Sequence, residues 1–222
     1  MTLEVVAIDG PSGSGKSTLA RRLAAALGWR HLDTGAMYRA ATLAVLRAKV
    51  RPDDEAAVVA LVEARRIELP DVGGVLLDGE DVAGAIRGPD VDAAVSAVSA
   101  LAGVRARMVE LQRAQAARGP LVAEGRDMTT VVFPDARWRF YLDADVAERA
   151  RRRQRDWRAA GAEREAAEVA RDLERRDRLD STRPLSPLRL AEGVRRIDTT
   201  ALDADQVLQV VLDAVRGERG CT

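Results

Sequence analysis

The sequence predicts an α/β fold in which a parallel sheet is covered by helices on both faces. Two observations predict it. Short apolar runs rich in β-branched residues alternate with segments of helical periodicity along most of the 222 residues, which is the pattern of crossover connections between parallel strands. A glycine-rich loop also joins the first run to the first helical segment, and neither an internal repeat nor a low-complexity linker breaks the pattern.

The glycine-rich loop lies between a strand and a helix. Residues 5–8 are apolar and β-branched and predict a buried strand. The helix that follows carries leucines four residues apart and ends at Gly28. The residues between them have the pattern of a phosphate-binding loop, and they are Gly10-Pro11-Ser12-Gly13-Ser14-Gly15-Lys16-Ser17-Thr18. This context predicts the P-loop NTPase type of α/β fold.

Such a loop binds the phosphates of a nucleotide mainly through its backbone. Glycines let consecutive N–H groups point at an anion, and the start of the helix adds a partial positive charge. Lys16 would contact the β- and γ-phosphates, and the Ser17 hydroxyl is a candidate ligand of Mg²⁺. The alternative interpretation is a glycine-rich turn with an exposed lysine, which the complete motif and both flanking elements disfavour.

The other elements follow from periodicity and from turn residues. Asp33-Thr34-Gly35 predicts a turn, Pro52-Asp53-Asp54 caps a helix, and Asp78-Gly79 predicts a hairpin. Residues 51–88 therefore predict a small α+β insertion. Strands are predicted over 29–33, 67–69, 75–77, 121–123, 138–142 and 194–197, and helices over 36–48, 55–65, 103–118, 146–160, 162–179 and 203–216, with a further helix that begins at Pro89.

Composition and charge exclude several classes of function. The formal net charge is zero, so no overall basic field predicts nucleic-acid binding. Lysine occurs only at Lys16 and Lys49, and the other basic side chains are almost all arginine, which suits bidentate phosphate binding. Cys221 is the only cysteine, so a disulfide framework is excluded. With no leader-like N-terminus and no bilayer-length apolar run, we expect a cytoplasmic protein without a membrane partner. We take it to be a monomer, which the sequence itself does not show.

Polar side chains follow the ends of several predicted strands. In a parallel sheet, ligands bind beyond the carboxyl ends of the strands, so these side chains should share one crevice with the glycine-rich loop. Thr34, Tyr38 and Arg39 are suited to hold the phosphate of a second substrate, and the alternative is a helix start with a solvated arginine. Arg126 and Asp127 would bind an acceptor phosphate and an amino group or hydroxyl, and the alternative is a surface ion pair.

Five arginines crowd the helix predicted over 146–160, and they are Arg149, Arg151, Arg152, Arg153 and Arg155. As a group they predict a mobile lid that closes over a triphosphate and stabilises transition-state charge. Helical spacing prevents all of them from facing one way, so some are only solvated. His31, the only histidine, is interpreted as a packing or solvent-facing residue. An acceptor phosphate is already ionised, so no general base is required.

Several motifs together resemble the bacterial cytidylate kinases, and the resemblance spans nearly the whole chain. The motifs beyond the glycine-rich loop are more specific than the loop itself. They are Leu32-Asp33-Thr34-Gly35-Ala36-Met37-Tyr38-Arg39, Gly125-Arg126-Asp127 with Thr130-Val131-Val132-Phe133-Pro134-Asp135-Ala136, and Arg176-Asp177 with Asp180-Ser181-Thr182-Arg183 and Ser186-Pro187-Leu188. The insertion at 51–88 resembles the enlarged monophosphate-binding region of that family.

The resemblance implies transfer of the γ-phosphoryl group of ATP to CMP or dCMP, with Mg²⁺ as cofactor. It implies catalytic roles for Lys16, Arg126 and Arg176. It further implies that Thr34, Tyr38, Arg39 and Arg126 hold the acceptor phosphate, that Ser96, Arg105 and Asp127 read the cytosine edge, that Asp180 and Arg183 contact the sugar, and that Arg149 and Arg153 contact ATP. We expect a single kinase domain with a core of about 1–35, 101–145 and 185–222, a monophosphate-binding region of about 36–100 and a lid of about 146–184.

Three residues depart from the family pattern. Thr129 stands where glycine is expected, and Glu124 and Glu192 stand where aspartate is expected. These departures leave the geometry of the local loops open. The competing interpretations are another nucleoside-monophosphate kinase, a small-metabolite kinase on the same fold, and a nucleotide-dependent switch. A nucleic-acid-binding ATPase is disfavoured by the zero net charge.

Overall fold

A five-stranded parallel sheet forms the centre of the protein. The computed structural model describes residues 4–70, 74–159, 161 and 164–219. The strand order is β2-β6-β1-β7-β8, and every adjacent pair runs parallel, which confirms the predicted α/β fold. The strands are β1 (Val5–Asp9), β2 (Arg30–Asp33), β6 (Leu121–Glu124), β7 (Trp138–Asp143) and β8 (Arg195–Asp198).

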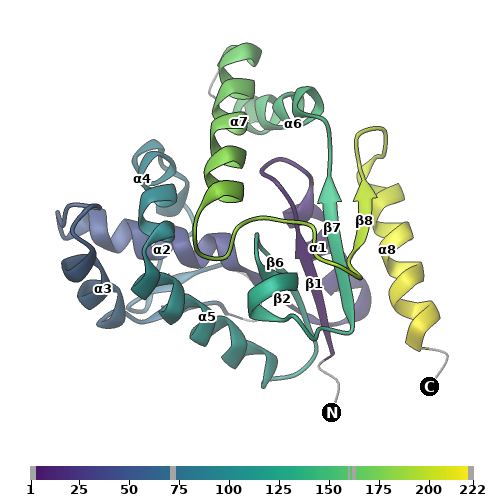
Figure 1. Ribbon diagram of the computed structural model, residues 1–222, viewed down its shortest axis with the longest axis horizontal. Coiled ribbons are helices and arrows are strands. Elements are labelled where there is room, and N and C mark those ends of the chain that lie inside the picture. The colour runs from purple at the N-terminus through teal and green to yellow at the C-terminus, as the bar shows by residue number, and fades with distance from the viewer. Residues whose placement is uncertain (1–3, 71–73, 160, 162–163, 220–222) are drawn as a thin grey trace.

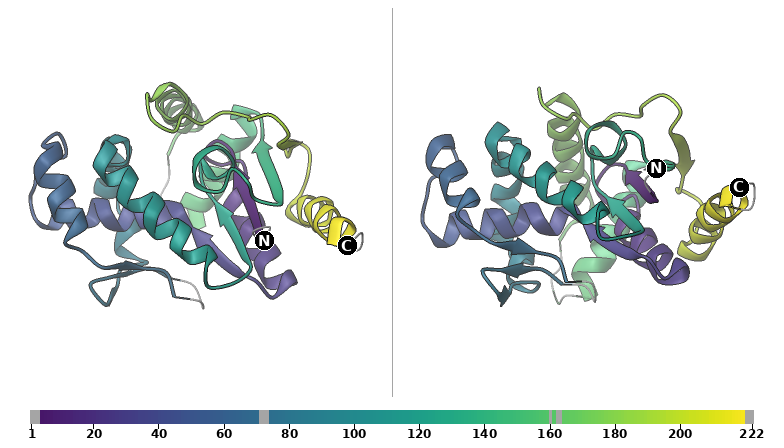
Figure 2. Two further views of the ribbon diagram at one scale, coloured as in Figure 1. Left: turned by 60° about the horizontal axis from the view of Figure 1, so that its bottom comes forward. Right: turned by 90° about the horizontal axis from the view of Figure 1, so that it is seen from below.

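Helices cover both faces of this sheet because β1 is apolar on both faces. Val5 and Ala7 pack in one core cluster with α2 (Thr34–Arg47) and α5 (Ala102–Ala116). Val6 and Ile8 pack in a second cluster with α1 (Lys16–Leu27) and α8 (Ala204–Arg219). Successive residues of a strand point to opposite faces, so a continuous apolar run requires two cores. Figure 2 shows α8 and α3 at opposite sides of the molecule.

The predicted α+β insertion lies beside α2. It contains α3 (Glu55–Glu63), the antiparallel strands β3 (Ile67–Glu68), β4 (Leu76–Leu77) and β5 (Glu80–Asp81), and the short helix η1 (Ala85–Arg87), and α4 (Pro89–Ala100) follows it. Asp78 and Gly79 have φ values of 53° and 89°, as a two-residue hairpin turn requires, so the predicted hairpin is confirmed. The carboxylate of Asp54 accepts from the Ala57 amide at 3.2 Å and caps α3, also as predicted.

Two helices project beyond the sheet at its carboxyl end. Figure 1 shows α6 (Val146–Ala159) and α7 (Ala166–Thr182) beyond the upper ends of the strands, with α7 above β6 and α6 between α7 and β7. They pack through a small apolar cluster that includes Ala150, Val169 and Leu173. α7 begins and ends later than the helix predicted over 162–179. Residues 160, 162 and 163 of the two predicted helices lie outside the described residues.

The turn predicted at Asp33-Thr34-Gly35 is wrong, because α2 already begins at Thr34. The Asp33 carboxylate accepts from the Ala36 amide at 2.9 Å and caps the helix. A side chain that bonds its own downstream backbone is typical of both turns and helix caps, so the sequence alone did not separate them.

The segment after Asp127 forms one π-helical turn, η2 (Met128–Val132). Asp9 holds it, because its Oδ1 accepts from the Met128 amide at 2.8 Å and its Oδ2 from the Thr129 amide at 2.8 Å. The Thr129 hydroxyl donates to the same Oδ2 at 2.7 Å. Burial raises the pKa of Asp9, and the hydrogen bonds from Thr129 and Met128 act against it. Threonine at this position therefore adds a bond that glycine lacks.

Two sequence expectations concern the cellular setting. In the parts of the chain that the structure describes, no helix combines the length and the apolar character that crossing a membrane requires. Cys221, the only cysteine of the sequence, lies outside the described residues.

Candidate active site at the carboxyl edge of the sheet

The glycine-rich loop leaves the carboxyl end of β1 in a conformation that needs glycine at two positions. Gly10 has a φ of 147°, and a Cβ atom there would lie 2.0 Å from the Leu142 carbonyl oxygen. Gly13 has a φ of 80°, and its Cβ would lie 3.1 Å from the Cβ of Arg149. Both positive φ values and both close approaches disfavour any side chain. The loop therefore runs tightly between β7 and the start of α6.

Lys16 is buried within this loop, with only 5% of the residue exposed. Its Nζ donates to the Pro11 carbonyl at 2.7 Å and to the Ser14 hydroxyl at 3.4 Å. Burial lowers the pKa of Lys16 to about 7, and the positive charge of Arg126 lowers it further, while Glu124 acts in the opposite direction. The two acceptors of Lys16 are uncharged oxygens, and a bound phosphate would supply a negatively charged partner for its ammonium group.

Ser17, at the end of the glycine-rich loop, is hydrogen-bonded to Glu124 of β6. The Ser17 Oγ donates to the Glu124 Oε2 at 2.6 Å, and the Thr34 Oγ1 donates to the Glu124 carbonyl at 2.7 Å. The half-buried His31 places its Nε2 3.2 Å from the Glu124 Oε1, a contact that the sequence did not predict. Hydroxyl and carboxylate oxygens are the donors that Mg²⁺ prefers. Among the described residues, no cluster of three His, Cys, Asp or Glu side chains could hold a metal, so an ion here would depend on phosphate oxygens and water as well.

A cavity of about 90 Å³ next to the loop is lined by a concentration of arginines, and we call it the arginine pocket. The structure brings together in its wall every residue that the sequence predicted for the acceptor, together with Arg176. These residues are Thr34, Tyr38, Arg39, Ser96, Arg105, Arg126, Asp127, Asp180 and Arg183. Its wall also includes Gly35, Val95, Ser99 and Gly125, which the sequence did not single out as site residues.

One wall of the arginine pocket carries a buried charge pair. Arg105 donates to the Asp127 carboxylate, and its NH1 donates to the Ser99 carbonyl at 3.1 Å. The Arg105 guanidinium also lies 5.5 Å from the centre of the Tyr38 ring. Burial raises the pKa of Tyr38 to about 12, although the charge of Arg105 opposes this shift. The Tyr38 hydroxyl is buried and has no partner at normal hydrogen-bond geometry among the described residues.

The other arginines of the pocket crowd one another. The Arg126 Nε donates to the Asp180 Oδ2 at 2.8 Å, and the Arg39 NH2 donates to the Asp92 Oδ1 at 2.5 Å. Burial lowers the pKa of Arg176 to about 10, and the charges of Arg126 and Arg39 lower it further. Three guanidinium groups held this close to one another favour a multiply charged anion.

The arginines of α6 have different roles. Arg149 is buried, and its NH1 donates to the Ser12 carbonyl at 3.0 Å and to the Asp177 Oδ2 at 2.6 Å, so it joins the glycine-rich loop to α7. The Arg153 NH2 lies 3.7 Å from the Asp92 Oδ2. The side chains of Arg151 and Arg155 are 67% and 70% exposed. The arginines therefore face different ways, as helical spacing predicted.

Sequence reasoning missed Thr199 at the end of β8. Its hydroxyl donates to the Ser14 carbonyl at 3.1 Å, and it accepts from Arg152 NH1 at 3.0 Å. The Arg152 NH2 also donates to the Thr199 carbonyl at 2.6 Å. Thr199 therefore connects the glycine-rich loop to α6, the helix predicted to form a lid. The available signal was its position directly after the last strand, where side chains of a parallel sheet reach the ligand crevice.

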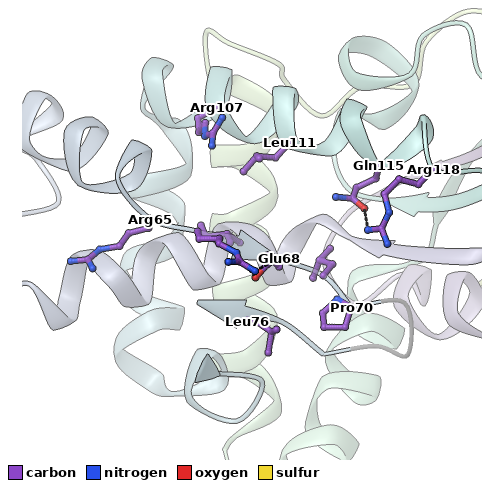
Figure 3. A pocket seen from close by; sticks show the side chains of 11 residues that line it. Arg65, Glu68, Pro70, Leu76, Arg107, Leu111, Gln115 and Arg118 are labelled. Atoms are coloured by element: carbon purple, nitrogen blue, oxygen red, sulfur yellow. Dashed lines mark hydrogen bonds and ion pairs between the residues drawn. The ribbon is translucent and has the colours of Figure 1, made fainter. Parts of the chain in front are cut away.

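A second cavity of about 500 Å³ lies between β3 and α5. Figure 3 shows Arg107, Leu111 and Gln115 on α5 facing Glu68 and Pro70. Its arginines already have acceptors on the protein: Arg65 pairs with Asp78, Arg66 with Glu68, Arg107 with Glu110, and Arg118 with Gln115. Arg65, Arg66 and Arg107 are thus already paired with carboxylates of the protein, and we assign no ligand to this cavity.

Sequence comparisons with known proteins agree on one family, and a solved structure of another kinase shares the fold. The family model described as cytidylate kinase matches residues 6–217. A cytidylate kinase of Mycolicibacterium paratuberculosis is 50% identical over 216 residues, which are 96% of this chain and 95% of that protein. One of Caldanaerobacter subterraneus is 46% identical over 211 residues, covering 95% and 94%. A solved shikimate kinase of Acinetobacter baumannii, in complex with shikimate, shares the fold with a TM-score of 0.50 at 19% identity, covering 98% of this chain and 96% of that one.

Proposed function

Because the chain belongs to the cytidylate kinase family, we propose that it transfers the γ-phosphoryl group of ATP to CMP or dCMP, giving ADP and CDP or dCDP. Family membership makes it a nucleoside-monophosphate kinase. The observation that carries the proposal for the acceptor is the arginine pocket, which combines a buried Arg105–Asp127 pair with the guanidinium groups of Arg39, Arg126 and Arg176. The Arg105–Asp127 pair offers hydrogen-bond donors and acceptors to a base, and the other three arginines offer positive charge to a phosphate.

Recognition of cytosine follows from its hydrogen-bonding edge. Cytosine presents an amino donor, a ring acceptor and a carbonyl acceptor. In our proposal the Asp127 carboxylate accepts from the amino group, while Arg105 donates to the acceptors and Ser96 completes the contact. Uracil exchanges donor for acceptor, so a carbonyl would face the carboxylate. A mispaired buried charge costs about 1–3 kcal/mol or more, which disfavours UMP.

Phosphoryl transfer in this site depends on positioning and on electrostatic stabilisation. Thr34, Tyr38, Arg39 and Arg126 would hold the acceptor phosphate, and Asp180 and Arg183 the sugar. The attacking phosphate oxygen is already ionised, so no general base takes part. Lys16 and Arg176 would stabilise the charge of the transferring group, and Arg149 and Arg153 would close over ATP from the lid.

The residues beside the glycine-rich loop fit Mg²⁺. The Ser17 Oγ and the Glu124 Oε2 are 2.6 Å apart, and both are hard oxygen donors. Ser17 would bind the ion, and Glu124 would orient water bound to it. When bound, Mg²⁺ neutralises charge on the ATP phosphates. Glu124 takes the place of the expected aspartate in this role.

We propose the same three functional regions that the sequence predicts. The core would comprise about 1–35, 101–145 and 185–222, the monophosphate-binding region about 36–100, and the lid about 146–184. We also propose that the protein acts as a cytoplasmic monomer, without nucleic-acid or membrane partners. Size-exclusion chromatography with light scattering measures the oligomeric state directly.

A coupled assay of ADP release tests the proposed function. The acceptors are CMP, dCMP, UMP, AMP and shikimate, each with ATP and Mg²⁺. We expect rapid release with CMP or dCMP, slower release with UMP, and little with AMP or shikimate. Release that does not depend on an acceptor would favour a nucleotide switch instead. Preference for shikimate would favour a small-metabolite kinase, which has no need of the Arg105–Asp127 pair.

A further inference from the structure

We propose that Asp92 takes the place of the acceptor phosphate on Arg39 when the site is empty, and that it links this arginine to the lid. The inference rests on the proposed function, because it needs a phosphate-bearing acceptor in the arginine pocket. Asp92 is a positioning residue in this proposal, since it acts through Arg39 and Arg153.

The two oxygens of the Asp92 carboxylate face different functional regions. Oδ1 accepts from the Arg39 NH2 at 2.5 Å, and Oδ2 lies 3.7 Å from the Arg153 NH2. Arg39 belongs to α2, Asp92 to the first turn of α4, and Arg153 to the lid helix α6. The side chains of Arg39, Asp92 and Arg153 are 19%, 29% and 28% exposed, so an incoming anion can reach all three. One carboxylate thus joins the predicted phosphate-binding and lid arginines.

The guanidinium group of Arg39 already donates hydrogen bonds to η1 and to α4. Its NH1 donates to the Ile86 carbonyl at 3.0 Å, and its NH2 donates to Asp92. Arg176 lies close enough to both Arg39 and Asp92 for their charges to shift its pKa in opposite directions. A phosphate group that reaches Arg39 must therefore compete with Asp92 for the NH2 edge, within a field that the neighbouring arginines already make positive.

In the competition for Arg39 the acceptor phosphate is favoured over Asp92, but displacing Asp92 lowers the net affinity for the acceptor. A nucleotide phosphate has more charge and more acceptor oxygens than a carboxylate, and charge-assisted bonds to arginine grow stronger with both. Displacement of Asp92 from Arg39 moves the carboxylate that also holds Arg153. Arg153 then becomes available to the triphosphate. Binding of the acceptor and of ATP is therefore coupled through Asp92, and part of the acceptor's affinity is spent on the displacement.

The variant Asp92→Asn tests the competition, with cytidine as the probe that lacks a phosphate. Calorimetric titrations should show CMP binding about two- to fivefold tighter than in the wild type, which corresponds to the loss of one partly exposed ion pair. Binding of cytidine should be unchanged. Asp92→Glu, which keeps the charge, should bind CMP as the wild type does. Asp90→Asn removes the same charge from the same helical turn at an exposed position and should have no effect.

The link to the lid is tested by binding CMP with and without a non-hydrolysable ATP analogue. In the wild type the analogue should strengthen CMP binding, and in Asp92→Asn this strengthening should fall by at least half. Weaker or unchanged CMP binding in the folded Asp92→Asn variant would overturn the competition. An equal gain for cytidine would overturn it too, because the effect would not depend on phosphate. If the wild type fails to phosphorylate CMP, the proposed function fails instead, so the two failures are distinguishable.

Discussion

Arg105 and Asp127 form an ion pair in the wall of the arginine pocket, and their side chains are only 5% and 4% exposed. The pair joins α5 to the segment that follows β6. A buried charge that loses its partner destabilises a protein strongly, so each residue fixes the position of the other. In the proposed function, both would therefore be held in place for a base before any substrate arrives.

The variant Asp127→Asn tests base choice. Asparagine offers a donor as well as an acceptor, so UMP gains a partner for its carbonyl and CMP loses a charge-assisted bond. We expect kcat/KM for CMP to fall by about tenfold or more, and the ratio of CMP to UMP activity to shrink by at least as much. The stability of the variant should be measured by urea unfolding alongside the kinetics, because loss of the Arg105–Asp127 pair also lowers the free energy of unfolding. An equal loss for both substrates would mean that Asp127 supports Arg126 or the phosphate instead of the base.

Lys16 should take up a proton when ATP binds. Its pKa is lowered to about 7 in the substrate-free protein, so at pH 8 the amine is mostly neutral. A triphosphate next to it favours the charged form and raises the pKa, and about one proton is then bound for each ATP. Below about pH 6 the group is already charged, and the uptake should vanish. Calorimetry of ATP-analogue binding in two buffers of different ionisation enthalpy measures this number.

The control for this measurement is the only other lysine. Lys16→Ala should lose both the proton uptake and the turnover while it remains folded, whereas Lys49→Ala, at an exposed position, should keep both. Near-normal acceptor-dependent ADP release by folded Lys16→Ala would refute the role of the glycine-rich loop. Equal proton uptake in Lys16→Ala and wild type would assign the uptake to another group.

Glu124→Gln should weaken the use of Mg²⁺. The glutamine keeps the size of the side chain but removes the charge that accepts from Ser17 at 2.6 Å. Loss of such a supporting group costs about tenfold or more in metal affinity, so the Mg²⁺ concentration for half-maximal rate should rise by about that factor. Glu124→Asp should show a smaller rise, and the KM for CMP should change little in both. An unchanged Mg²⁺ requirement in Glu124→Gln would separate Glu124 from the metal.

Closure of the site should protect two segments from hydrogen exchange. Kinases exclude water during transfer. Arg176 and Asp180 of α7 line the arginine pocket, and the Ile86 carbonyl of the insertion accepts from Arg39 in its wall. With CMP and a non-hydrolysable ATP analogue, exchange should slow both in the insertion at residues 51–88 and in the lid at residues 146–179. Protection confined to the glycine-rich loop would contradict closure by two segments.

Much of the fold and of the candidate site could be predicted from the sequence. The glycine-rich loop is a local motif, and its geometry depends on residues that are adjacent in the chain. The parallel arrangement of the strands places their carboxyl ends together, so the strand pattern alone was enough to predict that Arg39 and Arg126 share one crevice. The turn at 33–35 was wrong for a local reason, because Asp33 caps a helix instead.

Sequence by itself thus determined the α/β class, the phosphate loop and the family to which the chain belongs. Only the tertiary structure decided which distant side chains pair: Ser17 with Glu124, Thr199 with Ser14, and Asp92 with both Arg39 and Arg153. Periodicity tells which face of a helix or strand is buried, and it is a local property. The partner of a charged side chain depends on how separate elements pack and on where each rotamer can reach, which no local pattern encodes.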